Sequence, residues 1–379
     1  MIAVIQGIFV LVASLVIALL VAVGVLPDQV LAPEYQPPAL IEQQTASSTP
    51  QNTQESPDTA PEQTEENPPL ITDYEQSLQS ALDALAALKN QDASTTEPIS
   101  NLNETVRGAL VNILCTTAGS GPLNPISASG VIIDPRGVIL TNAHVAQYFL
   151  LKDYSSPDFI TCIARTGSPA KPAYNLELLF ISPSWIADNA QKIDDETPKG
   201  NGEHDYALLR ITGFIAAPDK GAPSQFPHLS VALDAPKVGD AMLVAGYPAG
   251  FLGGAIIQKE LYAASANATV QELYTFDTTT PDLFSIGGSV VAQQGSSGGA
   301  VARQDGALVG LITTSSQGET TGDRDLRALS TEYIIRSFES ERGISLANYL
   351  GRNLSIEHDL FMSSTAPLLT AQLIGVLEK

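Results

Sequence analysis

Three short segments of the chain carry side chains that together could hydrolyse an amide bond. His144 lies within residues 141–145, Asp205 begins residues 205–211, and Ser297 lies within the glycine-rich residues 295–300. A serine hydroxyl is a poor nucleophile at neutral pH. It needs a neutral imidazole to accept its proton and a buried carboxylate to orient that imidazole. We therefore expect Ser297 to be the nucleophile, with His144 as the base and Asp205 as the orienting carboxylate.

The loop around Ser297 could also stabilise the anion that forms during acyl transfer. Glycine permits dihedral angles that turn successive N–H groups toward one point, and a tetrahedral oxyanion needs such donors. Each segment alone has a plainer explanation: a single histidine after a strand is more often structural, and a Gly-Ser loop can be merely flexible. The three segments in the order His, Asp, Ser, each beside an expected strand, favour catalysis. Ser296 offers a neighbouring hydroxyl, but the register Gly-x-Ser-Gly-Gly selects Ser297.

Short β-strands are the elements expected to position these residues. Apolar and β-branched runs alternate with Gly, Pro, Asp and Asn, a pattern typical of an all-β barrel or sandwich. The clearest runs cover residues 128–133, 138–141, 207–211, 241–245 and 308–313. Helical patterning returns after Ser330, over residues 331–338 and in a second stretch ending at residues 368–377.

In these segments the chain resembles the chymotrypsin-like serine proteases, most closely the HtrA (Deg) branch. The similarity runs from about Asn112 to Ile335. Besides the three catalytic segments it rests on residues 129–134, 137–144, 238–240, 246–250 and 310–313. The resemblance implies an all-β fold of two six-stranded antiparallel barrels with flanking helices. It also implies a His144–Asp205–Ser297 triad and an oxyanion hole formed by the N–H groups of Gly295 and Ser297.

The resemblance also places two residues near the specificity pocket. Val291 lies where trypsin-like enzymes carry a carboxylate, which argues against cleavage after Arg or Lys and favours a small or medium apolar side chain. Thr313 falls where the family often has a small residue near the catalytic Asp. Ser296 replaces the usual Asn or Asp before the nucleophile, so activation of the digestive type is not expected.

Two further departures concern the length of the chain. Residues 150–201 form a longer stretch than in HtrA proteases, and we expect a surface insertion there. About forty residues follow Phe338, too few for the PDZ domain of that family. We expect these last residues to pack as helices on the second barrel.

The pattern of hydropathy divides the chain into five parts. From Gly7 to Leu26 only Ser14 is polar, and about 20 apolar residues in a helix span a bilayer. A cleaved signal peptide is the alternative. The expected parts are a transmembrane anchor (1–27), a disordered acidic linker rich in Pro, Gln and Thr (28–70), an amphipathic helix (71–100), the protease domain (101–340) and a C-terminal helical extension (341–379). The helix could pack on the catalytic domain or mediate homo-oligomerisation.

Composition limits the classes of function. The formal net charge of −22 argues against nucleic-acid binding, which needs a basic surface. The two cysteines and four histidines are scattered, so we expect no metal or other cofactor. Cys115 and Cys162 fall in predicted strands at residues 112–116 and 159–164, and they are either one disulfide or two buried thiols.

These features together predict a membrane-tethered serine endopeptidase. Its expected partners are protein or peptide substrates and the membrane contacted by residues 2–26. Its domain is expected outside the cytoplasm, periplasmic or extracellular, with a role in protein quality control or regulated cleavage. The alternatives are a catalytically silent protease fold that only binds, a scaffold that works through its linker and helix, and a hydrolase that cleaves esters.

Overall fold

The fold is seen in a computed structural model of the chain. It describes residues 97–119, 123–195, 200–217, 222–250, 252, 254–276, 279–315 and 324–379. The predicted anchor, the linker and residues 71–96 of the predicted helix lie outside these ranges. All described residues fall in one compact unit, Pro68–Lys379.

The first half of the protease domain is a closed barrel of six antiparallel strands, as predicted. Its strand order is β1-β2-β3-β6-β5-β4. The strands are β1 (Leu110–Thr117), β2 (Ile126–Asp134), β3 (Val138–Thr141), β4 (Ile160–Thr166), β5 (Lys171–Ile181) and β6 (Ala207–Phe214). The turn between β2 and β3 is formed by Asp134, whose carboxylate accepts from the Arg136 N–H at 2.8 Å, and by Gly137 at φ +86°.

The prediction of a surface insertion at residues 150–201 is wrong for most of that segment. β4 and β5 lie within it and complete the barrel, and the inner residues of β5 are buried. Only the part after β5 is added to the barrel, as α5 (Pro183–Asn189) and the short helix η2 (Ala190–Lys192). The first half of β5 is polar, so the sequence does not show the strand pattern there, although the second half of β5 packs in the core.

The second half is a seven-stranded antiparallel sheet, which corrects the expected six-stranded barrel. Its order is β8-β7-β11-β12-β13-β10-β9. The strands are β7 (Ala241–Gly246), β8 (Ala264–Thr269), β9 (Glu272–Tyr274), β10 (Leu283–Ser285), β11 (Ala300–Arg303), β12 (Leu308–Ser315) and β13 (Leu326–Ser330). The additional strand comes from the short hairpin of β9 and β10, which extends the sheet beyond β13.

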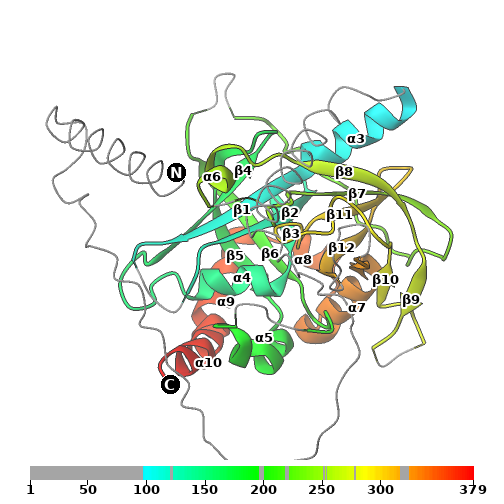
Figure 1. Cartoon of the computed structure of the whole chain (residues 1–379). Helices are drawn as coiled ribbons and strands as arrows, with labels where there is room; N and C mark the ends of the chain where they lie inside the picture. Colours follow the sequence, from blue (N-terminus) through cyan, green and yellow to red (C-terminus); the bar gives the residue numbers. More distant parts are fainter. Residues whose placement is uncertain are drawn as a thin grey trace, which may run out of the picture. The chain divides into compact units, whose positions relative to one another are not determined.

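Helices flank both sheets (Figure 1). They are α3 (Glu97–Ala109), α4 (Ala143–Leu150), α6 (Gly254–Lys259), α7 (Thr331–Arg342), α8 (Leu346–Leu350), α9 (Leu354–Ser364) and α10 (Ala366–Leu377). The predicted helix (71–100) covers only the first four residues of α3, which continues past residue 101, the predicted start of the protease domain, to Ala109. Its buried Leu102, Val106 and Ala109 face the core.

The C-terminal helices pack on the first barrel, and the expectation that they cover the second was wrong. Figure 1 shows α9 next to β5, and α10 contacts α4 and α5. His358 Nδ1 lies 2.8 Å from the Leu178 carbonyl oxygen, and Tyr349 donates to the Leu179 carbonyl at 3.2 Å. Of the described helices after Ser330, α7 packs on the second sheet, against β12 and β13.

Two other features of the described residues bear on the predictions. Cys115 and Cys162 face each other across β1 and β4 and are joined as a disulfide, with their Cα atoms 4.0 Å apart. Within the described ranges no single helix is both long and apolar enough to cross a bilayer, although α9 and α10 meet that test as a pair bent by 48°.

Candidate active site

His144 and Asp205 are brought together by the pairing of β3 with β6. The two strands are antiparallel, and Thr141 pairs with Ala207. The residues that follow β3 therefore lie beside those that precede β6. His144 Nδ1 is 2.8 Å from Asp205 Oδ2, and the His144 backbone N–H donates to Asp205 Oδ1 at 3.0 Å. A carboxylate only accepts hydrogen bonds, so Nδ1 carries the proton and Nε2 is left as an acceptor.

The Asp205 carboxylate is held as an anion inside the protein. It is 4% exposed, and Thr313 Oγ1 donates to its Oδ2 at 2.6 Å. Asn142 fixes the main chain there by donating from Nδ2 to the Asp205 carbonyl at 2.9 Å. Burial opposes ionisation, but the charge and hydrogen bond of His144, with the bonds from Thr313 and the His144 N–H, lower the pKa of Asp205.

The interaction with Asp205 shifts the pKa of His144 in the opposite direction. Burial disfavours the imidazolium, but the negative charge of Asp205 and its hydrogen bond outweigh burial and raise the pKa of His144 above its usual 6.5. The His144 side chain remains 33% exposed, so part of it is accessible from solvent. This environment suits a base that must take up a proton during the reaction.

The two serines of the glycine-rich loop differ in accessibility. Ser296 is 1% exposed, and its Oγ has no hydrogen-bond partner among the described residues. It lies against Gly246, where a Cβ atom would meet Ser296 at 3.2 Å. Ser297 is half-buried and therefore reachable. No hydrogen bond joins Ser297 Oγ to His144 Nε2, both of which lie in the described part of the chain; such bonds often tighten only when substrate binds.

The backbone at Gly295 has the geometry of a donor site. Gly295 has φ +92°, and a Cβ atom there would lie 2.5 Å from the Tyr247 carbonyl oxygen, so only glycine fits. Among bonds between described residues, the N–H groups of Gly295 and Ser297 donate to no backbone carbonyl. The carbonyl of Gln294 accepts from the Ala249 N–H at 2.7 Å, which turns the N–H of the same planar peptide to the opposite side.

The two residues predicted for the specificity pocket have different surroundings. Thr313 contacts Asp205, as described above. Val291 is fully buried in the core of the second sheet. Sequence reasoning missed Asn142 and Ala249, which hold the catalytic segments through amide groups. Both lie inside segments that carry the family resemblance, residues 137–144 and 246–250, but nothing in their type predicts these contacts.

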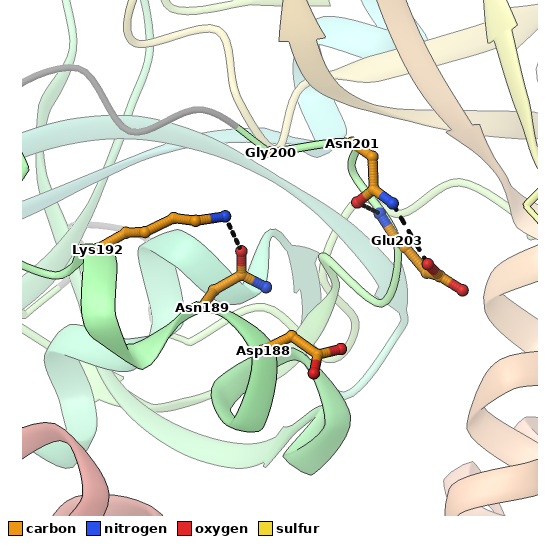
Figure 2. Close-up of a pocket in the computed structure, with 6 residues that line it drawn as sticks. All are labelled: Asp188, Asn189, Lys192, Gly200, Asn201 and Glu203. Atoms are coloured by element: carbon orange, nitrogen blue, oxygen red, sulfur yellow. Dashed lines mark hydrogen bonds between the residues drawn. The ribbon is translucent and has the colours of Figure 1, made fainter.

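A polar pocket lies beside the segment that leads to Asp205 (Figure 2). Its volume is about 470 Å³, and the residues that line it are Asp188, Asn189, Lys192, Gly200, Asn201 and Glu203. Lys192 Nζ donates to Asn189 Oδ1 at 2.9 Å, and the Glu203 N–H donates to Asn201 Oδ1 at 3.0 Å. None of the three predicted catalytic residues lines it. The described residues contain no cluster of three or more His, Cys, Asp or Glu side chains that could hold a metal ion.

Comparison with known proteins identifies the domain in which these residues lie. Residues 128–311 match the family model of the trypsin-like peptidase domain, a span that contains His144, Asp205 and Ser297. No curated protein sequence matches the chain.

Two solved structures illustrate the structural likeness. The active form of the Rv3671c protease from M. tuberculosis has 17% sequence identity and a TM-score of 0.40, covering 67% of this chain and 89% of its own. The serine endoprotease from Yersinia pestis has 19% identity and a TM-score of 0.42, covering 65% and 67%. From the match to the family model, residues 128–311 of the chain form a trypsin-like peptidase domain.

Proposed function

We propose that the chain cleaves peptide bonds through a triad of His144, Asp205 and Ser297. The observation that carries the proposal is the His144–Asp205 pair, bonded twice and buried on the aspartate side. It leaves His144 Nε2 as the base. Ser297 is the more exposed of the two adjacent serines.

The chemistry follows from these groups. Ser297 Oγ attacks the carbonyl carbon of the substrate while its proton passes to His144 Nε2. The carbonyl oxygen becomes an anion and accepts from the N–H groups of Gly295 and Ser297. His144 then donates its proton to the leaving amine, which departs as the acyl-enzyme forms. A water molecule, deprotonated by His144, releases the acyl group and restores Ser297.

Labelling with a fluorophosphonate tests the proposal on the full chain. The reagent phosphonylates an activated serine, and mass mapping identifies the residue. We expect labelling at Ser297 that is lost in His144→Ala, while Ser296→Ala is labelled at the wild-type rate. Labelling at Ser296, or labelling that does not depend on His144, contradicts the proposal.

A catalytically silent binding protein is the second candidate. It is favoured by one observation, the lack of a hydrogen bond between Ser297 Oγ and His144 Nε2. A folded wild-type chain that never reacts, even with peptide substrate present, supports this candidate. Reaction that begins when a peptide binds supports a protease whose site is completed by substrate.

We further propose that the protease is tethered to a membrane by residues 2–26, with its domain outside the cytoplasm. The apolar length of that segment supports the tether. The Cys115–Cys162 disulfide supports an oxidising compartment. Deleting residues 1–27 should move the protein from the membrane fraction, where alkaline carbonate does not extract it, to the soluble fraction. Extraction of the full chain by carbonate contradicts the tether.

The proposed role is quality control or regulated cleavage of proteins. Val291 supports cleavage after small or medium apolar residues, because it supplies no charge for Arg or Lys. A peptide library digested by the full chain should give apolar P1 residues. Preferential cleavage after Arg or Lys contradicts this specificity.

A further inference from the structure

Ser129 is a buried polar residue of the first barrel that contacts the nucleophile loop of the second half. It lies in β2 and is fully buried. Its hydroxyl donates to the Gly295 carbonyl at 2.8 Å and accepts from the Tyr247 N–H at 2.9 Å. Its backbone N–H donates to the Ser297 carbonyl at 2.7 Å, and its carbonyl accepts from Thr141 Oγ1 at 2.8 Å.

These bonds hold the peptides on both sides of the donor site. The peptide between Gln294 and Gly295 is held on its carbonyl side by Ala249, and the next peptide is held on its carbonyl side by the Ser129 hydroxyl. A peptide is planar, so fixing both carbonyls fixes the rotation of Gly295 between them. The direction of the Gly295 N–H then depends on Ser129 as well as on Ala249.

The Ser129 hydroxyl also links Tyr247 to Gly295 of the nucleophile loop. Tyr247 follows β7, and its carbonyl oxygen packs where a Gly295 Cβ atom would be. Because one hydroxyl binds the Tyr247 N–H and the Gly295 carbonyl, it sets the spacing between the two segments. A methyl group in its place leaves a buried donor and a buried acceptor unpaired, so this part of the loop gains freedom to rotate.

We propose that Ser129 is a positioning residue: its hydroxyl, acting across the interface of the two sheets, aims the Gly295 N–H at the developing oxyanion. The proposal rests on the proposed function, because it assigns a means of organising the same site. Ser129 touches no reacting atom. Its effect is therefore expected in the stabilisation of the transition state and not in the binding of substrate.

The test compares Ser129→Ala with Ser127→Ala in the full chain. Ser127 lies two residues away on the same strand, and its hydroxyl accepts from Asn112 instead of contacting the nucleophile loop. Removing a whole oxyanion donor lowers kcat by about 100- to 1000-fold. A change in the direction of one such donor should lower kcat by about 10- to 100-fold, with KM within about twofold of wild type. Ser129→Cys, which keeps a weak donor and acceptor, should fall between.

A transition-state analogue separates positioning from a general loss of structure. A peptidyl boronate built on a cleaved sequence forms a tetrahedral anion on Ser297, whereas the matching peptide carboxamide binds without that anion. Ser129→Ala should lower the affinity for the boronate by the same factor as it lowers kcat. It should leave the affinity for the carboxamide unchanged. Equal weakening of both ligands, or a kcat within twofold of wild type in a folded variant, overturns the proposal.

Hydrogen exchange gives a readout that does not need catalysis. The peptide that contains residues 294–298 should exchange faster in Ser129→Ala and at the wild-type rate in Ser127→Ala. Unchanged exchange there overturns the positioning role. The proposed function is decided separately, by His144-dependent labelling of Ser297 in the wild type, so its failure and the failure of the Ser129 proposal give different results.

Discussion

The disulfide between Cys115 and Cys162 offers a quantitative test of how the first barrel is stabilised. The two residues are 47 positions apart, and they pair directly across β1 and β4. In the chain-entropy model, linking residues at this separation lowers the entropy of the unfolded chain enough to stabilise the fold by about 4 kcal/mol. For a domain of this size, that corresponds to a rise in Tm of roughly 10 °C.

The perturbation is reduction of the wild type, compared with the double variant Cys115→Ala, Cys162→Ala. Trp185 is the sole tryptophan of the chain and is 8% exposed, so its fluorescence reports unfolding in urea. The oxidised wild type should be about 4 kcal/mol more stable than the reduced wild type and than the double variant. The reduced wild type controls for the lost sulfur of the buried Cys115, because it keeps that atom.

Two outcomes would refute this reasoning. Reductant that leaves the urea midpoint of the wild type unchanged would mean that the thiols are not joined. If, in addition, the double variant alone were less stable, its lower free energy of unfolding would come from lost side-chain packing and not from the crosslink.

Three further predictions concern the catalytic groups. The kcat/KM should rise with pH through a midpoint above 6.5, because His144 must lose a proton to act as the base and Asp205 raises its pKa; a midpoint below 6.5 in a pH–rate profile contradicts this. Thr313→Val should lower kcat about tenfold by removing the donor to Asp205 Oδ2, and Thr313→Ser should restore it; steady-state kinetics showing equal rates for both variants would dismiss the bond. Gly295→Ala should lower kcat about 100-fold, whereas Gly306→Ala, with a similar φ of +85° but no atom nearer than 4.0 Å, should leave kcat unchanged. An equal loss of kcat in both variants would mean that backbone strain alone explains the loss in Gly295→Ala.

Most strands that position the site were predictable because their apolar runs are short and bounded by turn residues. The runs at residues 138–141 and 207–211 correspond to β3 and to the start of β6. Their pairing then places His144 beside Asp205 without any further information. The six strands of the first barrel were expected from the family resemblance, because the pattern alone does not reveal β5.

The features that were missed are those set by tertiary contacts. β5 begins with polar residues and ends in the core, so its period is not visible in the sequence. The β9–β10 hairpin has only three residues in each strand, too few for a periodic pattern. The C-terminal helices gave no signal for the sheet on which they pack, because that choice depends on contacts such as His358 with the Leu178 carbonyl.

The positions that hold the site were also beyond sequence reasoning. Ser129 and Asn142 each donate a side-chain hydrogen bond to a backbone carbonyl distant in sequence. A serine or asparagine in a strand or at a helix start has many ordinary roles, so its type alone predicts none of these contacts. Only the folded arrangement identifies them.

The most direct test of the central claim is the rate of fluorophosphonate labelling of the full chain, with the modified residue mapped by mass spectrometry. We expect modification of Ser297 in the wild type and none in His144→Ala under the same conditions. Modification at another residue, equal labelling of the two proteins, or a folded wild type that stays unlabelled with and without peptide would contradict it.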